Sequence, residues 1–373
     1  MNIVKASIWV NFLTVSLSIF VAALLFLTVD FAFSRSILPE KQDMVLPPEQ
    51  KPYLEGDHGW YELKRDFVGS DSWGSKVYPV KTDHFGFRMN DQQDAVTAGE
   101  ADVIFLGDSY TYGISGRWSE TFVGMLERKL GRRVVNGGVS SYSPTVYLYQ
   151  YQKALDAGIL SKRHSVVVAL DISDIQDEAT RWESSSPHPI LLSPPPMNAD
   201  SEAGLVAKIK SRLLFTQRIA QYLRHHTGSD APDTSIYDMP RSAFTWKSWD
   251  QLDQETYPTG YAPLGVSGGI QRTTSQIIEL DKLVKQNNAK LYFLIYPWPA
   301  QIKHGTAKMD WERYVNDMCK KLSCAGVINT FPAFKQIAAH NPSWYKKYFI
   351  EGDVHFSTLG NSVVFGEIAK IIH

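Results

Sequence analysis

Short apolar runs alternate with amphipathic segments along the second part of the chain. The runs are largely continuous and rich in Val, Ile and Leu, a pattern typical of parallel strands that are buried on both faces. Strands joined by helices predict right-handed crossovers in one sheet. The expected fold class is α/β, a three-layer α/β/α sandwich with a central parallel sheet. The predicted strands lie within 101–108, 132–139, 164–173, 290–296 and 325–330, and the predicted helices within 119–131, 143–158, 271–289 and 310–322, with a last helix after 360.

The amino terminus has a different pattern. From Ile8 to Val29 the chain is mainly apolar and carries no charge, and about 20 such residues span a bilayer as a helix. A buried core helix rarely stays uncharged on every face over this length. A cleaved signal peptide is the nearer alternative, but its apolar region is usually shorter and ends in a small-residue cleavage site. We therefore predict an uncleaved signal anchor in residues 1–33, containing one transmembrane helix.

The remaining chain divides by composition. Residues 34–100 are rich in Pro, Gly and aromatic residues and contain few periodic segments, so we expect a stem that packs on the main domain. That domain extends over 101–373 and carries an insertion at about 184–269. Within the insertion, a proline-rich loop cannot form regular structure, and a basic amphipathic helix is expected at 205–223.

The side of the membrane is less strongly indicated. Lys5 precedes the apolar segment and Arg35 and Lys41 follow it, so the positive-inside rule gives only a weak signal. Cys319 and Cys324 lie five positions apart and either form a small disulfide outside the cytoplasm or remain two free thiols. We expect a single-pass protein of the inner membrane whose globular part lies in the periplasm or another extracytoplasmic space.

Ser109 is the first candidate for chemistry. It follows Gly107 and Asp108 at the end of the first predicted strand, in the stretch "FLGDSYTYG". A small polar loop that caps a helix has the same composition. However, active sites of open α/β sheets collect at the carboxyl ends of parallel strands, where a serine can act as a nucleophile.

A serine nucleophile needs a base and an orienting acid. His355 lies in a small-residue loop that opens the last helix, where it can take the serine proton and pass it to the leaving group. Asp353 lies two positions earlier, and in an extended segment it points to the same side as His355. Glu351 is the alternative acid, although its reach is awkward. We predict a triad of Ser109, Asp353 and His355.

The same chemistry needs donors for an oxyanion. The backbone N–H of Ser109 is one candidate, and that of Gly138 is a second. Gly138 follows Asn136 and Gly137 at the end of the second predicted strand, where glycine lets the backbone approach a substrate closely. An ordinary tight turn would also explain the glycine pair, and Asn136 can brace that turn.

Four segments in chain order now resemble the sequence blocks of the SGNH hydrolases, the GDSL-like esterase and acyltransferase superfamily, in its bacterial envelope type. They are "GDSYTYG", "VVNGGVSSYSP", "VVVALDISD" and "GDVHFSTLGN". The resemblance covers about 101–373 without the insertion, and implies a flavodoxin-like sandwich and an acyl-serine intermediate. The chain departs from the family at Ser173, where Asn usually supplies the third oxyanion donor, and at Tyr110, which replaces Leu. The D-x-H spacing is associated with polysaccharide acyltransferase-like branches.

The expected function is hydrolysis of O-acyl groups, chiefly O-acetyl groups, on an envelope carbohydrate. The first alternative is a polysaccharide O-acetyltransferase of the same fold, and the second is a decayed glycan-binding or assembly protein. Expected partners are an acylated glycan or small ester, the membrane, and for a transferase a membrane protein that donates acyl groups. No metal or cofactor is expected, since the histidines are scattered. The formal net charge of −1 argues against nucleic acid.

Overall fold

The computed structural model describes residues 2–37, 46, 48–56, 59–74, 76–91, 101–185, 188–192 and 240–373. The chain forms two compact units, one comprising 1–43 with 196–232 and the other 44–195 with 233–373. The basic amphipathic helix that the sequence predicts at 205–223 lies outside the described residues, as does most of the proline-rich loop. The predicted domain limits remain predictions.

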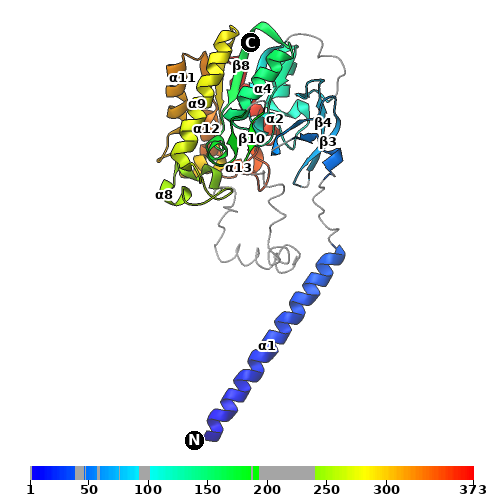
Figure 1. The fold of residues 1–373 in the computed structure, drawn as a ribbon. Helices are drawn as coiled ribbons and strands as arrows, with labels where there is room; N and C mark the ends of the chain where they lie inside the picture. Colours follow the sequence, from blue (N-terminus) through cyan, green and yellow to red (C-terminus); the bar gives the residue numbers. More distant parts are fainter. Residues whose placement is uncertain are drawn as a thin grey trace. The chain divides into compact units, whose positions relative to one another are not determined.

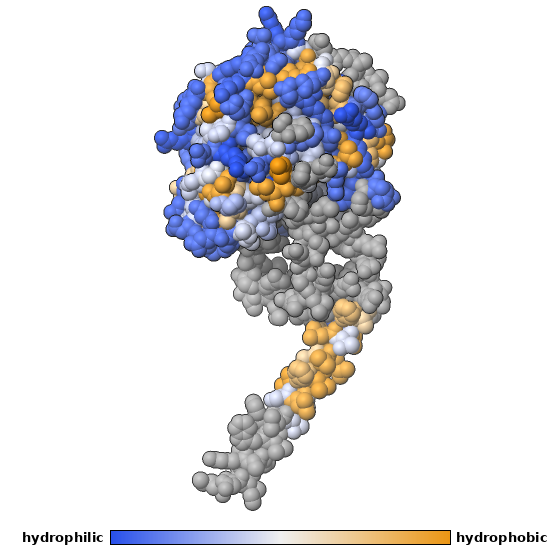
Figure 2. Space-filling view, viewed as in Figure 1, coloured by the Kyte–Doolittle hydropathy of each residue, from blue (hydrophilic) through white to orange (hydrophobic). Residues whose placement is uncertain are grey.

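The first unit contains the helix α1 (Asn2–Ile37). From Thr14 to Ala32 its mean hydropathy is 2.2, and only 6% of that window is buried. Figure 2 shows this stretch almost entirely in hydrophobic colours. Among the described residues, α1 is the one helix long and apolar enough to cross a membrane.

In the second unit, the described residues form one sheet of eight strands in the order β12-β11-β8-β6-β7-β5-β4-β3. The first five of these strands are parallel, as the apolar runs predict. Their bounds are β6 (Ala101–Leu106), β7 (Val134–Asn136), β8 (Leu160–Ala169), β11 (Lys290–Ile295) and β12 (Gly326–Asn329).

Helices cover both faces of this sheet. On one face α4 (Pro144–Asp156), α9 (Gly265–Gln286) and α11 (Trp311–Leu322) pack against the strands and α9 contacts both neighbours. On the other face α3 (Phe122–Leu130) packs against α14 (Thr358–Ile368). The chain runs one way along the sheet through α3 and back through α4, so right-handed crossovers put these two helices on opposite faces. The predicted α/β sandwich is confirmed.

The sheet is mixed rather than purely parallel, which the sequence pattern did not predict. Three antiparallel strands extend it beyond β7: β5 (Arg88–Met89), β4 (Lys76–Thr82) and β3 (Val68–Trp73). They come from the segment expected to be a stem, and Figure 1 shows β3 and β4 on the side of the body opposite α9 and α11. Strands β3, β4 and β5 therefore form part of the central sheet.

Smaller elements complete the described structure. Two short hairpins pair β1 with β2 and β9 with β10. Their bounds are β1 (Tyr53–Glu55), β2 (Tyr61–Leu63), β9 (Trp182–Glu183) and β10 (Ile190–Leu191). The remaining α-helices are α2 (Ser109–Tyr112), α5 (Asp174–Thr180), α8 (Trp249–Leu252), α10 (Pro299–His304), α12 (Phe331–His340) and α13 (Trp344–Tyr348), and the 3-10 helices are Pro48–Gln50, Trp118–Glu120 and Pro240–Thr245.

Helix α9 begins at Gly265, six residues before the start that its sequence pattern predicts. Glycines at 268 and 269 disfavour a helix interior, but here one of them serves packing. A Cβ at Gly269 would lie 2.2 Å from the carbonyl oxygen of Ile175 on α5. Glycine at 269 therefore lets α5 and α9 approach closely, and this long-range contact outweighs the low helix propensity.

A disulfide joins Cys319 and Cys324, with a Cα–Cα distance of 4.9 Å. It links the last turn of α11 to the segment that enters β12. The structure therefore has the disulfide, one of the two states that the spacing allowed. Such bonds persist in oxidising compartments.

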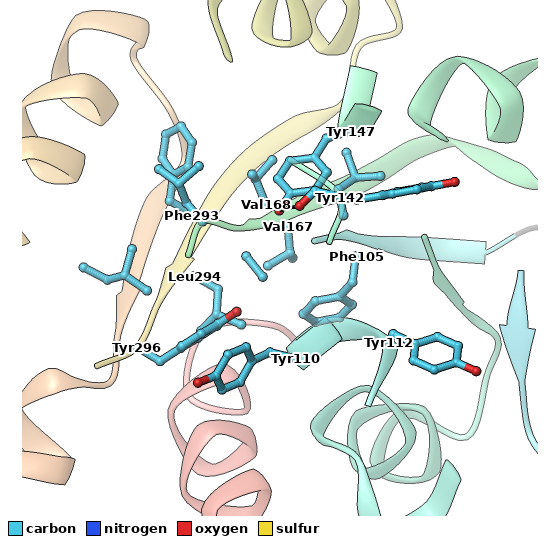
Figure 3. Close-up of a cluster of buried hydrophobic side chains, with 14 of the residues drawn as sticks. Phe105, Tyr110, Tyr112, Tyr142, Tyr147, Val167, Val168, Phe293, Leu294 and Tyr296 are labelled. Carbon is cyan, nitrogen blue, oxygen red and sulfur yellow. Dashed lines mark hydrogen bonds between the residues drawn. The ribbon is translucent and has the colours of Figure 1, made fainter. Parts of the chain in front are cut away.

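The core beneath the carboxyl ends of the strands is dense with aromatic side chains. Figure 3 shows Phe105 from β6, Val167 from β8 and Leu294 from β11 packed together, and all three are fully buried. Tyr110 and Tyr296 lie beside one another, with ring centroids 4.7 Å apart. This packing provides a rigid base for the loops that follow the strands.

Candidate active site

Ser109 is the first residue of α2, immediately after the loop that follows β6. The Asp108 side chain caps this helix by accepting a hydrogen bond from Tyr110 N at 3.0 Å. Glycine at 107 leaves room for Thr111 on α2, since a Cβ there would lie 2.1 Å from Thr111 Oγ1. Ser109 is 8% exposed, so this residue is largely buried.

The structure brings His355 and Asp353 to this serine from the other end of the chain. Ser109 Oγ lies 2.8 Å from His355 Nε2. His355 Nδ1 lies 2.5 Å from Asp353 Oδ1, which also accepts a hydrogen bond from the backbone N–H of His355 at 3.0 Å. One ring nitrogen therefore faces the serine while the other is held by a carboxylate, which is the geometry a serine nucleophile needs.

Asp353 lies in an environment that favours its ionised form. Burial by itself would raise the pKa of the Asp353 carboxyl, but the charge of His355 and the hydrogen bonds from His355 and Trp73 hold that pKa well below its ordinary value. Glu351, the alternative acid, is exposed. The imidazole bonds Asp353, and this geometry favours Asp353 over Glu351 as its partner.

Tyr110, at the position where the family that the sequence resembles usually has Leu, has a specific contact here. Its hydroxyl donates to the carbonyl oxygen of Val354 at 2.5 Å, and its ring centroid lies 4.6 Å from that of His355. Val354 is the residue between Asp353 and His355. Tyr110 therefore connects the nucleophile helix directly to the loop that carries the acid and base.

The three candidate oxyanion donors differ in availability. The N–H of Ser109 opens α2, and the first N–H groups of a helix have no partner within it. The N–H of Gly138 already donates to Asn136 Oδ1 at 2.9 Å, and a Cβ at Gly138 would lie 2.4 Å from Tyr112 N. Ser173 is fully buried, and its own N–H donates to Asp171. Of the three, the Ser109 N–H is the most available to a ligand.

Three buried carboxyls lie behind the nucleophile. Burial raises the pKa of Asp108 well above its ordinary value, and the neighbouring charge of Asp171 raises it further. Burial, together with Asp108 and Asp171, also raises the pKa of Asp174. Burial raises the pKa of Asp171 too, against hydrogen bonds from Ser173 and Trp298. The positive charge of Arg241 opposes the increase for Asp108 and for Asp171.

We expect Asp108→Asn to gain stability relative to the wild type as the pH rises. The unfolded carboxyl ionises at its ordinary pKa, whereas the folded one keeps its proton to higher pH, so wild-type stability falls as the pH rises through the folded pKa. Asn does not ionise, and its side-chain oxygen can still cap α2. Thermal melts of both full-length proteins across a pH series test this. A difference in melting temperature that does not change with pH would contradict it.

Two residues near the site were not recognised as candidates in the sequence. The Trp73 indole donates to Asp353, and the buried Arg88 guanidinium donates to the carbonyl oxygens of Tyr112 and Gly113 at the end of α2. Arg88 lies in "GFRMN", a segment resembling envelope members of the superfamily, whereas the only sequence signal for Trp73 is a Gly-Ser turn after it. Both residues come from the antiparallel strands.

The described residues contain no cluster of three or more His, Cys, Asp or Glu side chains that could hold a metal ion. The groups that meet at this site are a hydroxyl, an imidazole and a carboxylate.

No protein-family model matches the chain, and no curated protein matches its sequence. Among solved structures it is similar to a lipolytic protein of the G-D-S-L family from Desulfitobacterium hafniense, with 10% identity, a TM-score of 0.39, and coverage of 72% of this chain and 98% of that one. TesA has 11% identity and a TM-score of 0.39, with coverage of 72% of this chain and 97% of that one. Axe2, an acetylxylan esterase from Geobacillus stearothermophilus, has 13% identity and a TM-score of 0.39, with coverage of 74% of this chain and 96% of that one. At identities and TM-scores this low, the case for function rests on the geometry of the site.

Proposed function

We propose that the chain is a serine ester hydrolase of the SGNH superfamily, with Ser109 as nucleophile, His355 as base and Asp353 as orienting acid. The observation that carries the proposal is the continuous series of hydrogen-bonding contacts from Ser109 Oγ through both ring nitrogens of His355 to Asp353. The four sequence segments that resemble the superfamily's blocks support it independently.

In this mechanism His355 Nε2 takes the Ser109 proton as Oγ attacks the ester carbonyl carbon. The C=O π electrons move to the carbonyl oxygen, and the resulting tetrahedral oxyanion accepts a hydrogen bond from the Ser109 N–H. The imidazolium then protonates the leaving alcohol oxygen as the C–O bond breaks, leaving an acyl-serine. Water then attacks the acyl carbon as His355 Nε2 takes its proton, and His355 returns that proton to Ser109 Oγ as the Oγ–acyl bond breaks, which releases the carboxylic acid and restores the serine. Asp353 keeps the imidazole in the required tautomer throughout.

Gly138 joins the oxyanion hole in this proposal only when its N–H leaves Asn136 Oδ1. A substrate oxyanion competes for that donor with a neutral amide oxygen, and hydrogen bonds to ionised acceptors are about twice as strong. Ser173 is the weakest of the proposed donors because its side chain is fully buried. The reaction then depends chiefly on two backbone donors.

The proposed substrates are O-acetyl groups on an envelope carbohydrate. The apolar helix α1 and the Cys319–Cys324 disulfide favour an inner-membrane anchor with the catalytic unit outside the cytoplasm. Two alternatives have their own observations: the D-x-H spacing favours an O-acetyltransferase that passes the acyl group to a sugar hydroxyl, with a membrane protein as acyl donor, and the buried Ser173 fits a decayed glycan-binding protein.

An organofluorophosphonate probe tests the proposed chemistry, since it labels an activated serine covalently. We expect the full-length protein in detergent to be labelled at Ser109, and turnover of a chromogenic acetyl ester to fall in step with labelling. A folded protein that is neither labelled nor active would favour the glycan-binding alternative.

Analysis of envelope glycans from a deletion strain separates the two enzymatic alternatives. A gain of acetyl groups on deletion indicates an esterase, and a loss indicates a transferase. Fractionation of wild-type cells, which contain the protein, tests the anchor. Full-length protein in washed membranes supports it, whereas soluble protein with a shortened amino terminus would show that the apolar segment is a cleaved signal.

A further inference from the structure

Trp73 ends strand β3 and lies against the candidate triad. In the sequence, strands β4, β5 and β6 lie between Trp73 and Ser109. Its indole Nε1 donates to Asp353 Oδ2 at 2.5 Å. Its ring meets the His355 imidazole edge-on, with centroids 5.1 Å apart and planes at 78°. Trp73 is 37% exposed, so the ring also borders solvent beside the site.

The two carboxylate oxygens of Asp353 have separate partners. Oδ1 accepts both hydrogen bonds from His355, through the ring Nδ1 and the backbone N–H. Oδ2 accepts the hydrogen bond from Trp73. The rotation of an Asp carboxylate about its last torsion is soft. A donor on the second oxygen therefore fixes the plane of the carboxylate and with it the direction in which Oδ1 meets the imidazole.

Strand β3 is itself held firmly two residues before Trp73. Asp71 is 4% exposed and accepts hydrogen bonds from three tyrosine hydroxyls, those of Tyr53 at 3.2 Å, Tyr78 at 3.1 Å and Tyr112 at 3.0 Å. Tyr112 lies on α2, three residues after Ser109. One strand thus contacts the helix of the nucleophile through Asp71 and the acid of the triad through Trp73.

The turn after Trp73 also restricts its position. Trp73 pairs with Lys76 at the end of hairpin β3–β4, and Gly74, which follows Trp73, has a φ of +55°. Tight hairpin turns favour glycine at such positive φ values. The indole is therefore presented from the end of a short hairpin rather than from a long loop.

We infer that Trp73 is a positioning residue for the reaction, which holds the Asp353 carboxylate in the plane that orients His355 toward Ser109. This inference rests on the proposed function. It assigns part of the active site to the segment before the four superfamily-like blocks, and it makes hairpin β3–β4 a structural support of the triad.

The first test compares Trp73→Phe with the wild type, using full-length protein in detergent. Phe keeps an aromatic ring but has no N–H. Loss of a hydrogen bond to a charged group should lower kcat for a chromogenic acetyl ester by about 10- to 100-fold, with KM nearly unchanged. Trp73→His retains a ring N–H and should recover part of the rate. The matched control is Trp249→Phe, which loses an indole hydrogen bond to the Phe244 carbonyl elsewhere in the unit and should keep wild-type kcat.

A double-mutant cycle with Asp353→Asn distinguishes positioning from general structural damage. If Trp73 acts through Asp353, Trp73→Phe should cost less than about 2-fold in the Asp353→Asn background. Wild-type kcat in Trp73→Phe, or a full additive loss in the double variant, would overturn the inference while leaving the proposed function intact. Melting temperatures of all variants check that each is folded.

A readout that does not need activity separates failure of this inference from failure of the proposed function. The proton between His355 and Asp353 should give a strongly downfield proton NMR resonance that is absent in His355→Ala. Trp73→Phe should shift or broaden it, and Trp249→Phe should not. If the wild type neither turns over esters nor takes the organofluorophosphonate, the proposed function fails, and a role of Trp73 in the reaction fails with it. The resonance then still tests the structural part of the inference, that Trp73 holds the Asp353 carboxylate against His355. A resonance unchanged in Trp73→Phe would overturn it.

Discussion

Ser109→Ala should lose essentially all ester turnover, by about 10⁶-fold, the loss seen when a serine hydrolase loses its nucleophile. Labelling by an organofluorophosphonate should disappear as well, because no other group lies in hydrogen-bonding contact with His355 Nε2 in the described residues. The fold should survive. The lost hydrogen bond contributes about 1 kcal/mol, which corresponds to a shift of only about 2–4 °C in melting temperature for a unit of this size.

A suitable control is Ser161→Ala. Ser161 lies near the start of β8, at the edge of the sheet opposite the carboxyl ends of the strands, and its hydroxyl bonds Asp102 at 2.7 Å. This variant should keep wild-type turnover. A Ser109→Ala protein that hydrolyses a chromogenic acetyl ester at a rate near that of the wild type would remove Ser109 from the mechanism.

The second large effect is expected at Asp353. Without the carboxylate the imidazole can rotate or adopt the wrong tautomer, and in serine hydrolases this lowers the rate by as much as about 10⁴-fold. Asp353→Asn should therefore lower kcat far more than Glu351→Gln, because the Glu351 side chain is exposed. The residual activity of Asp353→Asn should exceed that of His355→Ala, in which the base itself is missing.

The measurement is kcat for the three variants under one set of conditions. If Glu351→Gln proved the more damaging of the two carboxylate changes, the acid of the triad would be Glu351, and the hydrogen bond between Asp353 and His355 would be structural.

The parallel part of the sheet could be predicted because each of its strands is a short apolar run followed by a helix. Ser109 could be selected because it follows a predicted strand, and active sites of open α/β sheets collect at the carboxyl ends of such strands. His355 could be selected because it lies in the small-residue loop that opens the last predicted helix. The structure brings them within 2.8 Å of each other although 246 positions separate them. Their catalytic roles, and that of Asp353, remain predictions.

The antiparallel strands could not be predicted in the same way. Strand β5 has only two residues, and β3 reads "VGSDSW", with little hydrophobic alternation. Their stability comes from partners far along the chain, such as the three tyrosines around Asp71, which no local pattern indicates. Trp73 was missed for this reason.

The hydrogen bond that the Gly138 N–H makes in the folded protein could not be predicted from the sequence either. The glycine pair after β7 is visible as a pattern, but the hydrogen bond to Asn136 Oδ1 depends on the side-chain rotamer of Asn136. That rotamer is fixed in turn by a hydrogen bond from Asn136 Nδ2 to the Thr111 carbonyl on α2. The turn after β7 and helix α2 therefore together determine whether the Gly138 N–H can donate to a ligand.

The pairing of Arg88 with Asn136, which joins β5 to β7, determines where a usable soluble fragment can begin. A fragment cut at residue 101, just before the first superfamily-like block, would contain Ser109, Asp353 and His355 but would turn β7 into a bare edge. Such an edge exposes unpaired N–H and C=O groups and is a template for aggregation. The guanidinium that donates to Tyr112 and Gly113 would be lost with it. Expression trials should therefore start upstream of β1, near residue 46, and insoluble material from shorter fragments would say nothing about whether the enzyme is active.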